Sequence, residues 1–234
     1  MSPRPASSTI WLKGAAAAFA LASTAQALVL NTGTLSIAPT GTLDLKNNNL
    51  VVRSGVLGVP TAGVYNGITG YIQTGLNING VIWAGFGINS SVAAANPSGI
   101  TAIGILNNAE AGYLSWPPLE PITLVGTEIL AKYTYFGDSD LGGTVDDGVD
   151  FQQFLLGLNS LGTLTGWLYG DYDYNGTTDD GQDFQLFLLG FNGPNTPLVG
   201  QGPELGAAAV PEPSSFALLA FGALRLASRR NRKQ

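Results

Sequence analysis

Residues 30–136 alternate apolar and polar positions over short stretches, and no stretch keeps the 3.6-residue spacing of an amphipathic helix. Residues 32–37 are echoed by residues 40–45, and each copy places its apolar residues two apart, which is the period of a strand. Asn, Gly and Pro turn signals separate the further strand candidates, which are residues 50–52, 62–65, 70–73, 80–88, 101–106 and 124–136. The pattern predicts a mainly β domain over residues 28–136.

Two β architectures fit this pattern. Many short strands joined by Gly and Asn turns fit a β-sandwich. The early repeat and the three asparagines at 47–49 fit one end of a β-solenoid, whose coils stack Asn and small residues. No clean repeat of about 20 residues persists along the segment, so the sequence leaves the solenoid and the sandwich open.

The pattern changes after residue 136, where an acidic loop followed by a helix is predicted twice. Residues 137–159 and 170–192 align without gaps and are identical at 16 of 23 positions, which indicates an internal duplication. In each copy, apolar residues follow the loop at i, i+3, i+4 and i+7, the spacing of one helix face. They are Phe151, Phe154, Leu155 and Leu158, then Phe184, Phe187, Leu188 and Phe191. Residues 137–193 are therefore predicted to form a small α-helical module.

The charge balance narrows the possible partners. Between residues 28 and 210 the basic residues are Lys46, Arg53 and Lys132, against fifteen acids, a formal net charge of −12. Such a surface repels nucleic acid, which is bound through Lys and Arg, and it attracts cations. The chain has no Cys and no His, which excludes disulfides, Cys/His zinc sites, thiolate nucleophiles and His-based acid–base catalysis.

Both ends of the chain have the pattern of a processing segment. Residues 1–27 combine a basic start, an Ala-rich apolar stretch and an Ala-Gln-Ala site, which predicts a signal peptide removed by signal peptidase before Leu28. Residues 210–234 contain Val-Pro-Glu-Pro, a short apolar stretch and an Arg-rich tail. An apolar stretch stopped by basic residues is typical of a membrane helix with a cytoplasmic flank. Residues 194–209 are then a linker.

The C-terminal segment resembles the PEP-CTERM sorting signal, which has a Pro-Glu-Pro motif, a membrane helix and an Arg-rich tail in this order. The resemblance implies recognition by an exosortase, cleavage near the motif, and release or attachment at the cell surface. We therefore expect an exported protein that sits transiently in the inner membrane, only through its removable C-terminal helix. Its destination is the cell surface or the extracellular space.

The acidic loops themselves predict a calcium site in each copy. Each loop carries five aspartates within thirteen residues, namely Asp138, Asp140, Asp146, Asp147 and Asp150, then Asp171, Asp173, Asp179, Asp180 and Asp183. Their carboxylates repel one another, and a hard divalent cation that prefers oxygen ligands removes this repulsion. A glycine at the sixth place of each loop, Gly143 or Gly176, permits the sharp bend that turns ligands inward.

The duplicated plan resembles the type I dockerin module, which has two EF-hand-like calcium loops, each followed by a helix. By this resemblance the ligands in the first loop are Asp138, Asp140, Asp146 and the carbonyl of Thr144, and those in the second are Asp171, Asp173, Asn175, Asp179 and the carbonyl of Thr177. Place 12 departs from the family pattern in both copies, so the last ligand is expected one residue later, at Asp150 and Asp183. Place 5 of the first loop is Gly142, which offers no side chain, so the second loop is expected to bind more tightly.

These features predict a non-catalytic, calcium-stabilised protein of the cell surface or extracellular matrix, with a structural or adhesive role. One alternative is docking to a cohesin-like protein, although the family's usual Ser-Thr recognition pair is replaced by Asp-Gly in both loops. Another is polysaccharide binding, and a third is an accessory role in polysaccharide degradation. Trp83, Trp116 and Trp167 could stack sugars or pack in the core, and Glu110, Glu120 and Glu128 have no setting that marks a glycosidase acid.

Overall fold

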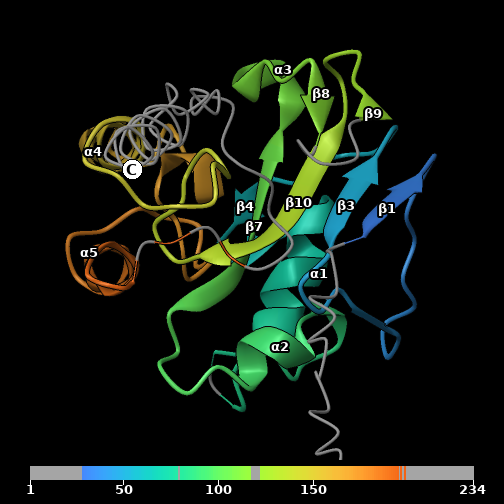
Figure 1. Cartoon of the computed structure of the whole chain (residues 1–234), viewed down its shortest axis with the longest axis horizontal. Helices are drawn as coiled ribbons and strands as arrows, with labels where there is room; N and C mark the ends of the chain where they lie inside the picture. Colours follow the sequence, from blue (N-terminus) through green and yellow to red (C-terminus); the bar gives the residue numbers. More distant parts are fainter. Residues whose placement is uncertain (1–27, 79, 117–121, 195, 197, 199–234) are drawn as a thin grey trace, which may run out of the picture.

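A four-stranded sheet lies at the centre of the computed structural model, which describes residues 28–78, 80–116, 122–194, 196 and 198 (Figure 1). The strand order is β1 (Val29–Thr32), β3 (Asn49–Val52), β10 (Ile129–Tyr135) and β7 (Thr101–Asn107). β1 and β3 are parallel, whereas β10 is antiparallel to both β3 and β7. Every residue of β3 and of β10 is buried. Both faces of these strands are therefore covered, and the polar residues Asn49, Lys132 and Thr134 are buried together with the apolar ones.

Short elements surround this sheet. Three two-stranded pairs are formed by β2 (Thr42–Asp44) with β6 (Gly87–Asn89), β4 (Pro60–Thr61) with β5 (Val64–Tyr65), and β8 (Ser115–Trp116) with β9 (Ile122–Thr123). Among the described residues the helices are α1 (Gly67–Leu76), α2 (Ser91–Ala94), α3 (Asn108–Ala111), α4 (Val149–Asn159), the 3-10 helix η1 (Trp167–Tyr169) and α5 (Gln182–Phe191). The architecture is thus a mixture of small sheets and helices.

The predicted strand at residues 70–73 is wrong, because these residues lie within helix α1. Ile68, Ile72 and Leu76 are buried at a spacing of four residues, which is a helical face that a four-residue window does not reveal. Gly75 belongs to this helix because a Cβ at this position would lie 1.7 Å from the carbonyl oxygen of Ile88 in β6. At this position the glycine permits a close approach of two backbones and does not form a turn.

Of the two β architectures left open by the sequence, the β-solenoid is not formed by the described residues. The two copies of the early repeat do not stack as coils, since β1 ends at Thr32 and pairs with β3, while β2 pairs with β6. Of the strand predicted at residues 80–88, only the end forms a strand, which is β6. The strand predicted at residues 62–65 is present only as β5 of the β4–β5 pair. The sandwich and the mainly β description are not confirmed either, because three of the α-helices of the described chain fall within residues 28–136. The strands expected at 50–52, 101–106 and 124–136 are confirmed as β3, β7 and β10.

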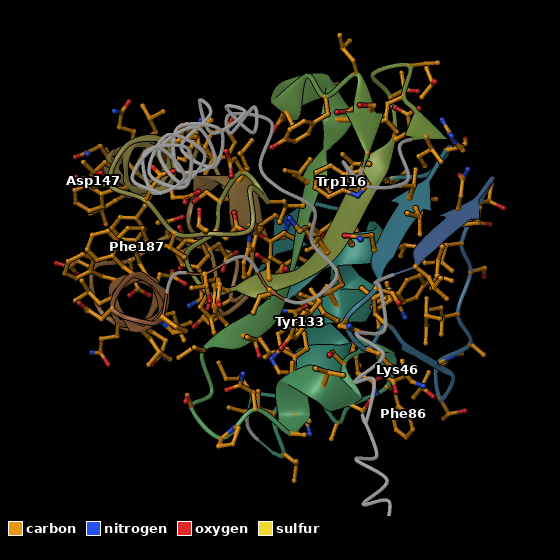
Figure 2. All side chains as sticks on the ribbon, in the orientation of Figure 1. Lys46, Phe86, Trp116, Tyr133, Asp147 and Phe187 are labelled. Atoms are coloured by element: carbon orange, nitrogen blue, oxygen red, sulfur yellow. The ribbon has the colours of Figure 1, made fainter. Side chains whose placement is uncertain are left out.

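The two helices predicted from the duplication are confirmed as α4 and α5, which lie side by side at the end of the molecule away from β1 (Figure 1). Aromatic rings join them, and Phe187 lies between the two helices (Figure 2), with its ring centroid 5.3 Å from that of Phe151 and 5.9 Å from that of Phe154. Each helix also approaches the backbone that precedes the other copy's loop. A Cβ on Gly157 of α4 would lie 1.8 Å from the carbonyl oxygen of Tyr169, and a Cβ on Gly190 of α5 would lie 1.8 Å from that of Phe136.

The duplicated segment shares one hydrophobic core with the rest of the described chain. This core includes Val51, Ile103 and Leu130 of the sheet together with Phe154 and Tyr174 of the duplication. The division between residues 136 and 137 stays a prediction. None of the described helices is long and apolar enough to cross a membrane, and the predicted signal peptide and C-terminal membrane segment lie outside the described residues.

Candidate metal centres

The two acidic loops follow the same backbone path. The first follows the end of β10 at Tyr135, and the second follows the end of η1 at Tyr169. At the fourth place, Leu141 and Tyr174 have φ angles of 62° and 58°, and at the sixth place Gly143 and Gly176 have φ angles of 106° and 92°. A φ of this sign is unfavourable for most residues and acceptable for glycine. The bend expected at the sixth place is therefore present in both loops.

The first aspartate of each loop has one satisfied and one unsatisfied oxygen. Asp138 and Asp171 are both 0% exposed. Oδ2 of Asp171 accepts hydrogen bonds from the Tyr65 hydroxyl at 2.5 Å and from the Gly176 N–H at 2.9 Å. Oδ2 of Asp138 accepts from the Thr134 hydroxyl and, at 2.9 Å, from the Gly143 N–H. In both residues Oδ1 is buried without a hydrogen-bond partner, which is costly for an anionic oxygen unless a ligand satisfies it.

Two further aspartates lie close to the first aspartate of each loop. Carboxylate oxygens of Asp138, Asp140 and Asp150 lie within 4.8 Å of one another, and those of Asp171, Asp173 and Asp183 do the same. The acid at place 13, rather than the residue at place 12, thus reaches the group in both loops. Such a set of hard oxygen ligands fits calcium, and the first aspartate of each set also has one buried oxygen without a hydrogen-bond partner.

The last aspartate of each group is anchored to its own loop. Oδ1 of Asp150 accepts from the backbone N–H of Ser139 at 2.8 Å, and Oδ2 accepts from that of Asp146 at 2.9 Å. Asp183 makes the equivalent bonds to the N–H groups of Tyr172 and Asp179, at 2.8 and 3.1 Å. These bonds close each loop onto the first turn of the following helix.

Asp146 and Asp179 are not members of the two carboxylate groups. Asp146 Oδ1 accepts from the backbone N–H groups of Gly148 and Val149, each at 2.7 Å, at the start of α4, and Asp179 Oδ1 accepts from the Gly181 N–H at 2.7 Å. The Asn175 Oδ1 accepts from the Thr177 hydroxyl at 2.7 Å. Thr144 is half-buried and Thr177 is exposed, and the ligand roles of their carbonyls stay predictions.

Burial dominates the electrostatics of both groups. Burial, together with the neighbouring carboxylates of the group, raises the pKa of Asp171 to about 7 and that of Asp183 to about 8. In the first group, burial also raises the pKa of Asp138 and that of Asp150. The neighbouring Asp140 carboxylate raises both of these pKa values as well. Several adjacent buried carboxylates are difficult to ionise together, and a bound divalent cation would favour their charged forms.

Sequence reasoning did not find the residues that hold the loops from outside. The Thr134 hydroxyl could have been suspected, since it lies four residues before Asp138 in a strand that leads into the loop. Tyr65 had no such signal, because it is 106 positions from Asp171 in the chain.

The residues considered for other activities are placed differently. Trp83, Trp116 and Trp167 are 2%, 4% and 1% exposed, so they pack in the core and offer no sugar-stacking face. Burial alone would raise the pKa of Glu128, but hydrogen bonds from the N–H of Val125, from other nearby backbone N–H groups and from Asn108 lower it to about 2. Glu128 is therefore a poor proton donor at neutral pH. Glu110 is exposed on α3, and Glu120 lies outside the described residues.

Comparisons with known proteins identify the C-terminal end of the chain. The profile of the PEP-CTERM protein-sorting motif matches residues 209–233, where the sequence predicts this signal. The comparison with curated proteins and the comparison with solved structures gave no match. The dockerin resemblance of residues 137–193 stays a prediction. The matched motif supports an exported protein that an exosortase sorts to the surface or to a membrane-associated position.

Proposed function

We propose that this surface-sorted protein is a non-catalytic structural or adhesive component, in which each duplicated loop binds one calcium ion. The observation that carries the proposal is the pair of buried, unpartnered Oδ1 atoms of Asp138 and Asp171, each grouped with two further aspartates. In this proposal Asp138, Asp140 and Asp150 hold one ion, and Asp171, Asp173 and Asp183 hold the other. The ion supplies positive charge to buried carboxylates and fixes the loop that starts each helix.

Calorimetric titration of the exported chain with calcium tests the proposal. Two ions are expected per chain, and Asp150→Asn or Asp183→Asn should each remove one of them. Asp147→Asn and Asp180→Asn are matched controls, because they remove the same charge from neighbouring aspartates that are exposed. Figure 2 shows Asp147 at the outer edge of the duplicated half. The proposal is refuted if the chain takes up no calcium at millimolar concentration, or if the control variants lose as much binding as Asp150→Asn and Asp183→Asn.

Docking to a protein partner is the second candidate, and the exposed leucines of the duplication favour it. Leu155 and Leu156 of α4 are 36% and 53% exposed, and their equivalents Leu188 and Leu189 of α5 are 37% and 40% exposed. The same apolar pair is thus accessible on both helices. If a cohesin-like protein binds here, Leu156→Glu combined with Leu189→Glu should abolish its binding and leave calcium uptake intact. Polysaccharide binding has less support, because the tryptophans are buried.

A further inference from the structure

Each loop of the duplication is supported at the same two points by side chains from residues 28–136. The first point is Oδ2 of the first aspartate, which accepts from the Thr134 hydroxyl in one loop and from the Tyr65 hydroxyl in the other. The second point is the carbonyl oxygen at the fourth place. The Lys132 Nζ donates to that of Leu141 at 2.7 Å, and the Gln73 Nε2 donates to that of Tyr174 at 2.7 Å. A duplicated pair of loops is therefore supported by an N-terminal half that is not duplicated.

We propose that Tyr65 and Thr134 are positioning residues of the two cation sites, each serving one loop; this rests on the calcium binding proposed above. Oδ2 of the first aspartate is held between a hydroxyl and a glycine N–H. With Oδ2 fixed on both sides, the carboxylate cannot rotate freely. Its other oxygen, Oδ1, is the buried and unpartnered one. The hydroxyls therefore orient a ligand before the ion arrives, as outer hydrogen-bond partners do in metal sites.

Both hydroxyls come from well-packed positions. Thr134 is 0% exposed and lies within β10, paired with Ala102 of β7. Tyr65 is 6% exposed, and its ring packs edge-on against Tyr174 with the centroids 6.3 Å apart. Its hydroxyl donates to Asp171 Oδ2 at 2.5 Å. The support is thus preorganised and does not depend on a mobile side chain.

The arrangement also links distant parts of the chain. Tyr65 in β5 and Asp171 are 106 positions apart, so an ion held by Asp171 stabilises the contact between the N-terminal half and the second loop. Thr134 and Asp138 act within a short stretch around the end of β10. The cation affinity of the second loop therefore depends on the fold of residues 28–136 as well as on the loop itself.

The test measures each site alone in the exported chain. Asp150→Asn leaves only the second site, and Asp183→Asn leaves only the first. With only the second site present, Tyr65→Phe is expected to raise the calcium Kd about tenfold, the lower end of the effect of outer-shell partners. With only the first site present, Tyr65→Phe should leave the Kd unchanged. Thr134→Val should raise the calcium Kd of the first site and leave that of the second site unchanged. Thr134→Ser, which keeps the hydroxyl, should restore the affinity of the first site.

Tyr71→Phe is the matched control, because Tyr71 is a partly exposed residue of α1 and no change in either Kd is expected. A residue that only stabilised the fold would lower the unfolding temperature in EDTA without a site-selective change in Kd. The proposal is overturned if Tyr65→Phe and Tyr71→Phe have the same Kd at the second site, or if Tyr65→Phe weakens both sites equally. If Tyr65→Phe does not fold, the comparison of Thr134→Val with Thr134→Ser decides. A parent chain without calcium binding would instead refute the proposed function.

Discussion

Replacing Glu128 by Gln should strongly destabilise the protein, because this carboxylate holds the turn before β10. The side chain is 0% exposed. Its Oε1 accepts from Arg53 Nη1 at 2.9 Å and from the Val125 N–H at 2.8 Å. Its Oε2 accepts from the N–H groups of Gly126 and Thr127 at 2.9 and 3.1 Å, and from the Asn108 amide at 3.3 Å. Every group that faces the carboxylate is therefore a donor.

The magnitude follows from this set of donors. Gln retains one acceptor oxygen and places an NH₂ group against at least two donors, whichever way its amide is turned. Removing one partner of a buried ion pair lowers the free energy of unfolding by about 3–5 kcal/mol. The Arg53 side chain is 32% exposed, so its charge can still be hydrated, and we expect the low end, about 3 kcal/mol. For a chain of this size that corresponds to a decrease in Tm of roughly 6–12 °C.

Differential scanning calorimetry of the exported chain at pH 7 measures this effect. Glu110→Gln is the control, because Glu110 is exposed and a surface change of this kind is expected to alter stability by less than about 0.5 kcal/mol. The pKa of Glu128 is lowered to about 2, so its stabilising effect is present above the unfolded pKa of about 4.3 and is lost as the pH falls toward 2. The Tm of Glu128→Gln and the Tm of the parent chain should therefore converge at acidic pH. A Glu128→Gln protein whose Tm at pH 7 equals that of Glu110→Gln would refute this reasoning.

Three further predictions concern the loops and the ends of the chain. Calorimetry should show the second loop binding calcium more tightly than the first, and Gly142→Asn should narrow the difference; equal affinities in the parent chain would contradict this. Because burial raises the pKa of Asp171 to about 7 and that of Asp183 to about 8, the folded ion-free protein holds protons that the unfolded chain releases. Its Tm in EDTA should fall as the pH rises from about 4 to about 8, and calcium should restore it at pH 8; a Tm in EDTA that rises over this range would contradict the assignment. Mass spectrometry of surface-released protein should show Leu28 as the first residue and no Arg-rich end, and an intact Lys233 would contradict exosortase processing.

The sequence predicts the duplicated half well because its signals are local. The helices α4 and α5 follow from apolar spacing within eleven residues or fewer, and the acids that form each group lie within thirteen residues. The place of the last acid in each group also follows, because Asp150 and Asp183 are shifted by the same single residue. Short-range periodicity and spacing are the features that sequence reasoning handles best.

The N-terminal half is predicted less well because its structure depends on distant contacts. Residues 67–76 contain three glycines and still form a helix, in which Gly75 lets the backbone of β6 approach closely. β10 lies between β3 and β7, which are far apart in the sequence, and no local pattern gives this order. The support from Tyr65 to Asp171 is likewise invisible until the fold brings the two residues together.

The reciprocal packing of Gly157 and Gly190 has an evolutionary consequence. Each helix rests on the backbone that precedes the other copy's loop, so a single loop–helix unit could not form this contact with itself. Two identical units could form it as a symmetric homodimer, in which each contact occurs twice. Tandem duplication of such a unit turns a concentration-dependent association into an intramolecular one. Once the two units share a chain, each is free to diverge, and the two copies now differ at 7 of their 23 aligned positions.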